Sequence, residues 1–289
     1  MRRLIVNADD FGYTAGINRA IVEAHAGGIV TSTTLMARGR AFEPAAQLAK
    51  TQPRLSVGCH IVLIDGEPVL PPSQISSLTS DGRFGDGLKM FAVRALAGRI
   101  RPEQIEAEAG AQIQKLQGAG ICVSHVDTHK HTHLFPSVLR PILRAAARCG
   151  VRAIRNPFGP RRPFRSGELL RRPDLWTRYV EVRVLTGLAG KFREATRRAG
   201  FLTPDGTLGV VVTGALDEDL FRAIAQTIPE GTWEFVCHPG YNDDELKSAR
   251  TRLRESRQTE LDVLTRPEAR QVLDRQGVEL ISYRDLIAA

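Results

Sequence analysis

The sequence predicts an α/β fold, a single (β/α) barrel of the TIM-barrel kind over residues 1–289. Short apolar runs rich in β-branched residues alternate with helical stretches, a pattern typical of parallel βα units. Polar residues follow several of these runs, as at the carboxyl rim of a barrel. The 289 residues, 42% of them hydrophobic, suffice for one large core.

The strands are expected where apolar runs are short and end in polar or turn-forming residues. The first is Leu4-Ile5-Val6, which leads into Asn7 and two aspartates. Later runs repeat this form after each helical stretch. The expected strands are residues 4–7, 31–35, 55–61, 121–126, 153–155, 208–212, 233–237 and 278–282.

The helices are expected between these strands, with local signals at several ends. Pro136 suits a helix start, and Gly150, Gly200 and Gly277 suit positions just beyond helix ends. The expected helices are residues 16–26, 41–50, 102–118, 136–149, 174–199, 216–228 and 243–273, the last broken near Pro267. Residues 68–87, rich in Pro, Gly and Ser, predict a long excursion after the third strand.

Charge is concentrated in one segment. The formal net charge is +8, and residues 151–200 alone hold 13 Lys and Arg against 4 Asp and Glu. We expect a basic helical and loop insertion at about residues 158–200. Its residues 161–165 could meet an anionic membrane surface or nucleic acid, whereas a solvated helix face explains the same composition.

Cysteine usage and the N-terminus indicate the compartment. Cys59, Cys122, Cys149 and Cys237 are scattered through a chain too large to need disulfides. The first apolar run is too short for a signal peptide, and no run approaches membrane-spanning length. We therefore expect a cytoplasmic protein, with a position at the inner membrane left open.

The first candidate for chemistry is the pair Asp9 and Asp10, at the end of the first strand. Neighbouring residues of a strand point to opposite faces. Both carboxylates can thus enter one site only if the chain bends at Phe11-Gly12, which Gly12 permits. A cap for the helix that follows is the alternative.

The other candidates are histidines near later strand ends. His60 interrupts an apolar strand, while Cys59 points to the opposite side of the pleat. Residues 125–133 hold four of the seven histidines. In an extended segment His125, Asp127, His129, His131 and His133 share one side, and a disordered metal-binding tract is disfavoured by the apolar residues on both flanks.

Two further strand ends offer His238 and Arg155. A histidine titrates near neutrality and so can donate a proton to a leaving group. An arginine can orient a catalytic carboxylate or hold its pKa down. Carboxylates and imidazoles together suit Zn²⁺, which we favour, while Co²⁺, Ni²⁺, Mn²⁺, Fe²⁺ and Mg²⁺ remain open.

These segments resemble the YdjC-like carbohydrate deacetylases, a family that includes chitooligosaccharide deacetylases. The matching segments are residues 7–12, 28–35, 58–60, 125–133 and 237–239. The resemblance implies a distorted (β/α) barrel, like that of polysaccharide deacetylases, with a divalent metal held by Asp10, His60 and His129. It further implies Asp9 as the general base, and related deacetylases suggest Arg155 as its partner and His238 as the acid.

Within that family, residues 62–72 look like the hopanoid-associated branch called HpnK. That likeness implies removal of acetyl from a lipid-linked N-acetylglucosamine, with chitooligosaccharide as the alternative acceptor. The family carries Leu or Met where this chain has Cys59, a change expected to be harmless in the core. The expected substrate contacts are Phe11, Asp127, His131 and His133.

Other function classes remain as alternatives. The pair His125 and Asp127 matches part of an iron-oxygenase triad, but those enzymes have all-β folds. A metal-dependent phosphoesterase fits the same ligands. A basic lipid-binding or nucleic-acid-binding protein leaves the aspartate and histidine clusters unexplained, so we expect no nucleic-acid partner. A homodimer is left open.

Overall fold

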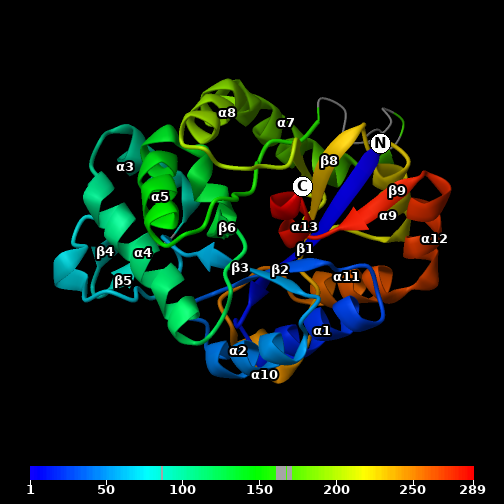
Figure 1. The fold of residues 1–289 in the computed structure, drawn as a ribbon, viewed down its shortest axis with the longest axis horizontal. Coiled ribbons are helices and arrows are strands. Elements are labelled where there is room, and N and C mark those ends of the chain that lie inside the picture. Colours follow the sequence, from blue (N-terminus) through cyan, green and yellow to red (C-terminus); the bar gives the residue numbers. More distant parts are fainter. Residues whose placement is uncertain (86, 161–166, 168–170) are drawn as a thin grey trace.

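The computed structural model describes residues 1–85, 87–160, 167 and 171–289. A curled parallel sheet lies at its centre, and helices surround it (Figure 1). The strand order is β6-β3-β2-β1-β8-β7, and β9 also pairs with β1. The strands are β1 (Arg2–Phe11), β2 (Ser32–Leu35), β3 (Ser56–Ile61), β6 (Val126–Thr128), β7 (Gly206–Leu208), β8 (Gly231–Cys237) and β9 (Val278–Ile281).

The central strand is β1, which is longer than the expected residues 4–7. It pairs with β8 from Arg2 to Ala8, with β9 from Arg2 to Ile5, and with β2 from Asn7 onward. Its side chains are buried beyond Arg3, since the strand is covered on both faces. The two aspartates therefore belong to the strand itself.

The two ends of the curled sheet meet through an irregular segment. The expected strand at residues 153–155 is present only as isolated parallel bridges, from Ile154 to Val126 and from Ala153 to Leu202. Farther along, the Thr207 amide of β7 donates to the Phe158 carbonyl. These contacts connect β6 to β7, which confirms an α/β fold with a barrel-like sheet.

The helices alternate with the strands as expected, with shifted ends. Pro102 and Pro136 occupy first turns, where a missing amide proton costs nothing. The α-helices are α1 (Ala15–Ala26), α2 (Phe42–Thr51), α3 (Leu88–Leu96), α4 (Pro102–Gly118), α5 (Pro136–Arg148), α7 (Trp176–Leu185), α8 (Ala189–Arg198), α9 (Glu218–Ala225), α10 (Asp244–Ser248), α11 (Glu255–Thr265), α12 (Pro267–Arg275) and α13 (Tyr283–Ala288).

Short elements complete the part of the chain that the structure describes. The excursion expected at residues 68–87 contains a hairpin of β4 (Thr79–Ser80) and β5 (Arg83–Phe84). The 3₁₀-helices are η1 (Pro72–Gln74), η2 (His129–Leu134), η3 (Pro173–Leu175) and η4 (Thr186–Leu188). The helix expected at residues 174–199 is therefore interrupted by η4.

Several expected boundaries were wrong. The strand expected at residues 121–126 begins only at Val126. The one expected at residues 208–212 ends at Leu208, because Gly209 turns the chain with φ 92 and a Cβ there would lie 2.5 Å from the Val236 carbonyl oxygen. The helix expected at residues 243–273 is broken at Pro267, as predicted, and also between Ser248 and Glu255.

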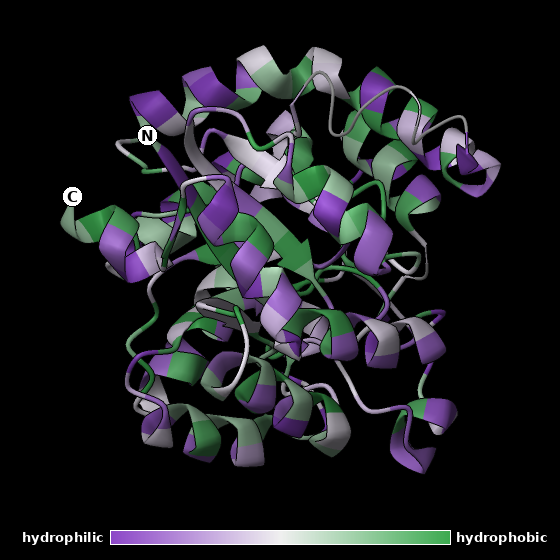
Figure 2. Cartoon of the chain, turned by 90° about the vertical axis from the view of Figure 1, so that its right-hand side faces the viewer, coloured by the Kyte–Doolittle hydropathy of each residue, from purple (hydrophilic) through white to green (hydrophobic). Residues whose placement is uncertain are grey.

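Side-chain alternation along β1 separates two environments. Leu4, Val6 and Ala8 lie in the main hydrophobic core between sheet and helices, whereas Ile5 packs with Tyr283 in a small separate cluster. Figure 2 shows the central strands as largely hydrophobic, with hydrophilic bands on the surrounding helices. The face of β1 inside the curl of the sheet therefore lies outside the main hydrophobic core, and polar side chains can occupy this face near the carboxyl end of the strand.

Two compositional expectations can be compared with the described residues. The four cysteines are free, and Cys59 lies in the main core as expected. Within the described ranges, no helix has both the length and the apolar character to cross a bilayer. Residues 161–165 of the basic segment lie outside the described residues.

Candidate active site

A β-bulge near the end of β1 brings Asp9 and Asp10 into one site. Ala8 pairs with Thr33 and Phe11 with Leu35, so both aspartates stand opposite Thr34 alone. Asp10 has φ 68, a left-handed conformation that aspartate tolerates better than most residues. The decisive bend is therefore at Asp10, one residue before the expected Phe11-Gly12, and Gly12 with φ 88 forms the turn that follows.

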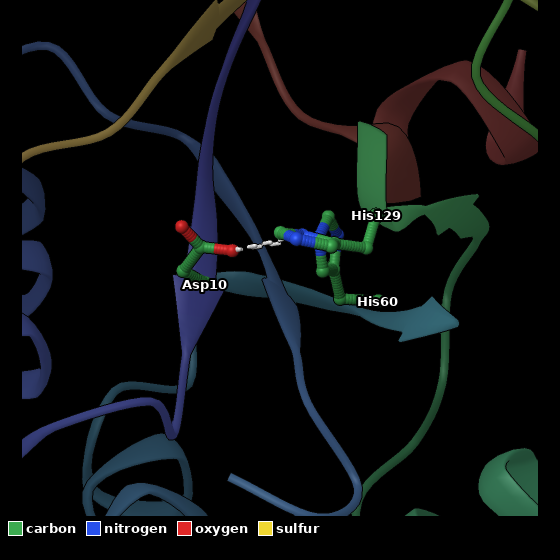
Figure 3. A group of neighbouring side chains, drawn as sticks. All are labelled: Asp10, His60 and His129. Carbon is green, nitrogen blue, oxygen red and sulfur yellow. Dashed lines mark hydrogen bonds and ion pairs between the residues drawn. The ribbon is translucent and has the colours of Figure 1, made fainter. Parts of the chain in front are cut away.

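Asp10, His60 and His129 converge from the ends of β1 and β3 and the start of η2 (Figure 3). His60 Nε2 lies 3.5 Å from Asp10 Oδ1 and 3.3 Å from His129 Nδ1. The same Asp10 oxygen is 3.7 Å from His129 Nδ1. One carboxylate oxygen and two imidazole nitrogens thus face a common point, which is a donor set suited to a divalent cation.

His60 is oriented by Asp127 on the neighbouring strand. Asp127 Oδ1 lies 2.8 Å from His60 Nδ1, which leaves Nε2 directed at Asp10. Burial opposes protonation of His60, but the Asp127 carboxylate outweighs it and raises the pKa to about 9. At His129, burial prevails and lowers the pKa to about 4.

Asp9 is held by Arg155, as the sequence suggested. Two nitrogens of Arg155 lie 2.8 Å and 2.6 Å from the two oxygens of Asp9. The side-chain amide of Asn7 also donates a hydrogen bond to Asp9 Oδ1 at 2.9 Å. Burial opposes ionisation of Asp9, yet the guanidinium outweighs it and keeps the pKa well below its usual range. Asp9 is therefore an ionised and oriented carboxylate.

Arg155 is fully buried inside the curl of the sheet, where it balances several acids. It contacts Asp127 at 2.7 Å and Glu234 of β8 at 2.7 Å, in addition to Asp9. Glu234 also accepts a hydrogen bond from the Tyr283 hydroxyl at 2.6 Å. A buried arginine with this many carboxylates fixes their positions, because each loses water on burial and needs a partner.

His238 follows β8 and faces Asp9. Its Nε2 lies 3.8 Å from Asp9 Oδ2, and its backbone amide donates to Glu260 Oε2 at 2.5 Å. Burial lowers the pKa of His238 to about 4. Burial also raises the pKa of Glu260 to about 7, although the hydrogen bond from the His238 amide and the positive charge of Arg257 both act to lower it. The imidazole of His238 thus lies beside Asp9 in the same site.

The remaining predicted residues are placed differently. His133 is fully buried, with its ring nitrogens near the Thr128 hydroxyl at 2.6 Å and the Arg155 carbonyl at 3.1 Å. His131 is half-buried, and its Nδ1 has no hydrogen-bond partner among the described residues. Phe11 lies in the main core, and Lys130 and His131 both have φ 52, so strand alternation does not extend past Thr128.

Four site residues were missed by the sequence analysis. Glu234 is a lone charge inside an apolar strand, a signal comparable to that of His60. Arg257 and Glu260 are buried positions of α11, and their neighbours give little sign of it. Thr34, opposite the bulge, contacts Asp127 Oδ2 at 3.1 Å and His60 Nδ1 at 3.2 Å.

Comparison with known sequences identifies the family. The family model described as YdjC-like protein matches residues 3–275. The chain belongs to this family. A carbohydrate deacetylase of Brevibacillus brevis is 33% identical over 98% of this chain and 99% of its own length. A carbohydrate deacetylase of Geobacillus stearothermophilus is 35% identical, and a chitooligosaccharide deacetylase of Escherichia fergusonii is 32% identical. Each alignment spans at least 98% of both chains.

Solved structures share the fold of this YdjC-like protein over nearly the whole chain. A protein of Enterococcus faecalis, named for cellobiose-phosphate cleavage, is 26% identical with a TM-score of 0.78 and covers 99% of this chain and 98% of its own. A lactam utilization protein of Thermus thermophilus is 15% identical with a TM-score of 0.50, over 97% and 99% of the two chains. The latter shares the fold alone.

Proposed function

We propose that this YdjC-like protein is a metal-dependent carbohydrate deacetylase that hydrolyses the N-acetyl group of an N-acetylglucosamine-containing glycoconjugate. The observation that carries the proposal is the convergence of Asp10, His60 and His129 beside a second, separately held carboxylate, Asp9. The names of the relatives, carbohydrate and chitooligosaccharide deacetylases, support the same activity.

Asp10, His60 and His129 would hold the cation. Their ligand atoms lie within 4.8 Å of one another, and three protein ligands leave coordination positions for water and substrate. Zn²⁺ suits this mixed oxygen and nitrogen set, with Co²⁺, Ni²⁺, Mn²⁺ or Mg²⁺ as alternatives. When bound, such a cation polarises the acetamide carbonyl and makes a water molecule more acidic.

Asp9 is the general base of the proposal. Arg155 keeps it ionised and fixes both its oxygens on one side, next to the proposed cation site. From there the carboxylate takes a proton from the attacking water. Asp127 and Glu234, which share Arg155 with Asp9, hold the base in place and do not react.

His238 is the proposed general acid. An amide nitrogen leaves poorly unless it is protonated, and the His238 ring is the nearest imidazole to Asp9 that is not assigned to the cation. With a pKa of about 4 the ring is neutral at pH 7, so it must first receive a proton. Asp9, whose Oδ2 lies 3.8 Å from His238 Nε2, is the group placed to transfer the proton that it took from water.

Four residues were expected to contact substrate, and their positions separate them. His131 is the contact that we retain, because its Nδ1 has no partner among the described residues. Asp127, His133 and Phe11 are fully buried. We propose that these three residues have supporting roles. Asp127 orients His60, His133 holds η2 in place, and Phe11 packs in the core beneath the bulge.

We favour a lipid-linked acceptor, a hopanoid-linked N-acetylglucosamine, over a chitooligosaccharide. Helix α7 supports contact with an anionic membrane surface, because Trp176, Val180 and Val184 are spaced four residues apart and are 45%, 53% and 74% exposed. Arg183 adjoins this face, and α8 adds exposed cations at Lys191, Arg193, Arg197 and Arg198. An apolar stripe with adjacent cations is typical of helices that lie on membranes.

The activity is tested by mass spectrometry of two N-acetylglucosamine conjugates, a chitooligosaccharide and a hopanoid-linked sugar, incubated with protein and one divalent metal at a time. We expect loss of one acetyl group, faster from the lipid-linked sugar, and no loss in the presence of a chelator. Inactivity toward both with every metal would contradict the proposal. Release of phosphate but not acetate from a mixed panel would instead indicate the phosphoesterase alternative.

Membrane contact is tested separately by flotation with vesicles of phosphatidylcholine containing about one third phosphatidylglycerol. We expect binding that weakens at high salt and is lost in the double variant Val180→Ser with Val184→Ser. The matched control is Val93→Ser with Leu96→Ser on α3, two residues that are 59% and 74% exposed, close to the values for Val180 and Val184. If both double variants lost vesicle binding equally, or if neither lost it, α7 would be excluded as the membrane contact.

A further inference from the structure

Arg257 is a buried cation of the site that neither the sequence motifs nor the proposed reaction uses. It lies on α11 and is 1% exposed. One terminal nitrogen, Nη2, donates to Asp10 Oδ2, Nε donates to the Leu253 carbonyl at 3.2 Å, and Nη1 reaches the His238 carbonyl at 3.5 Å. The guanidinium is thus held by three acceptors at a fixed place behind Asp10.

The two oxygens of Asp10 therefore have different surroundings. Oδ1 faces His60 and His129, at 3.5 Å and 3.7 Å, whereas Oδ2 is engaged by Arg257. A free carboxylate can bind a cation through both oxygens. Occupation of Oδ2 leaves Asp10 only one oxygen to offer.

We propose that Arg257 is a positioning residue that restricts Asp10 to a single oxygen ligand. This inference rests on the proposed cation site. With one oxygen from Asp10 and one nitrogen from each histidine, the protein supplies three ligand atoms. The restriction preserves the open positions that water and the substrate carbonyl require, because a second oxygen from Asp10 would take one of them.

Arg257 also connects this ligand to the turn that carries the proposed acid. Its side chain reaches the His238 carbonyl, and its own carbonyl accepts a hydrogen bond from the Gly240 amide at 3.1 Å. A Cβ at Gly240 would lie 3.1 Å from Cδ of Arg257, so the turn packs directly on this side chain. One residue of α11 therefore sets the spacing between Asp10 and His238.

The test is Co²⁺ substitution, since the visible absorption of bound Co²⁺ weakens as its coordination number rises. We expect Arg257→Gln to bind one Co²⁺ with a weaker band than the wild type and to lose about 10- to 100-fold in kcat, with KM little changed. The control is Arg172→Gln, which removes a partly exposed ion pair with Asp217 away from the site. That variant should keep the wild-type spectrum.

A second variant covers the case in which Arg257→Gln does not fold. Arg257→Lys keeps a cation that can reach Oδ2 but lacks the nitrogens for Leu253 and His238. It should keep the wild-type Co²⁺ band and lose part of kcat. A wild-type spectrum in Arg257→Gln, or a weakened band in Arg257→Lys, would overturn the inference. Failure of the wild type itself to bind Co²⁺ would instead contradict the proposed function.

Discussion

Asp9 and Asp10 are adjacent in the sequence, yet different cations hold them. Arg155 binds both oxygens of Asp9, while Arg257 engages one oxygen of Asp10 and leaves the other facing two histidines. The two carboxylates thus differ in the number of oxygens that remain available. This difference supports a ligand role for Asp10 and places Asp9 outside the proposed ligand set.

The role of Asp9 is tested by Asp9→Asn, which keeps the shape of the side chain and removes the base. We expect kcat to fall by about 10²-fold or more while one metal ion remains bound, because Asp9 is not among the proposed ligands. Acetate release and metal content are measured on the same preparation, with exposed Asp274→Asn as control. Near wild-type activity in metal-loaded Asp9→Asn would remove Asp9 from the mechanism.

Glu260 makes stability depend on pH. Burial raises its pKa from the usual 4.5 to about 7, so between these values the folded state retains a proton that the unfolded state has lost. This contribution to stability is present below pH 4.5 and is lost as pH rises through 7. We expect Glu260→Gln, which keeps an acceptor for the His238 amide, to be more stable than the wild type by up to about 3 kcal/mol at pH 8.

The difference between Glu260→Gln and the wild type should shrink toward zero near pH 4.5. Chemical denaturation of both proteins across this pH range, with a chelator present, measures it. Because other titrating groups are common to both proteins, only their difference is compared. A difference that does not change with pH would show that folding leaves the pKa of Glu260 unshifted.

At the scale of elements, the ends of the strands determine the site. The bulge opposite Thr34 turns Asp9 and Asp10 to one side, and η2 begins at His129 directly after β6. Between β7 and the following segment, Gly209 ends the strand with φ 92. Each of these features is a local departure from regular strand geometry at the same edge of the sheet.

The end of β7 is tested by Gly209→Ala. We expect a loss of about 2 kcal/mol or more in the free energy of unfolding, because φ 92 disfavours a side chain and the new Cβ would meet the Val236 carbonyl oxygen at 2.5 Å. The control is Gly190→Ala in the exposed part of α8, where a Cβ meets nothing within 4 Å. That change should stabilise by about 0.5–1 kcal/mol, and urea denaturation compares the two.

At the scale of the molecule, the site connects elements that are distant in the chain. Asp10 on β1 contacts Arg257, 247 residues later, and Arg155 reaches Asp9 across 146 residues. A cation bound by Asp10, His60 and His129 would connect β1, β3 and η2. Metal binding is therefore expected to stabilise the whole fold and not only the local loops.

The global effect is measured as a shift in Tm on adding Zn²⁺ to metal-free protein. At about 100 times Kd the gain is about 2.7 kcal/mol, which corresponds to roughly 4–5 °C for a domain of 289 residues. Asp10→Asn should fold, since asparagine tolerates the left-handed conformation, and should lose most of this shift. A full shift in Asp10→Asn would place the ion elsewhere.

The alternation of strands and helices and most candidate residues could be predicted from the sequence, because periodicity and residue type are local properties. Asp9, Asp10, His60, His129, Arg155 and His238 all follow or end apolar runs, and the structure brings them to one edge of the sheet. Strand ends were less predictable. Gly209 and the bulge at Asp10 depend on what the chain packs against.

The sequence by itself determined the fold class, the family and the residue types of the site. The tertiary structure decided which cation each carboxylate pairs with, Arg155 with Asp9 and Arg257 with Asp10. Arg257 and Glu260 were missed because a buried charge on a helix is recognised only by its distant partners, and nothing within a few residues of Arg257 points to Asp10. In a low-dielectric interior each ion must find such a partner, and only the folded chain determines which one it finds.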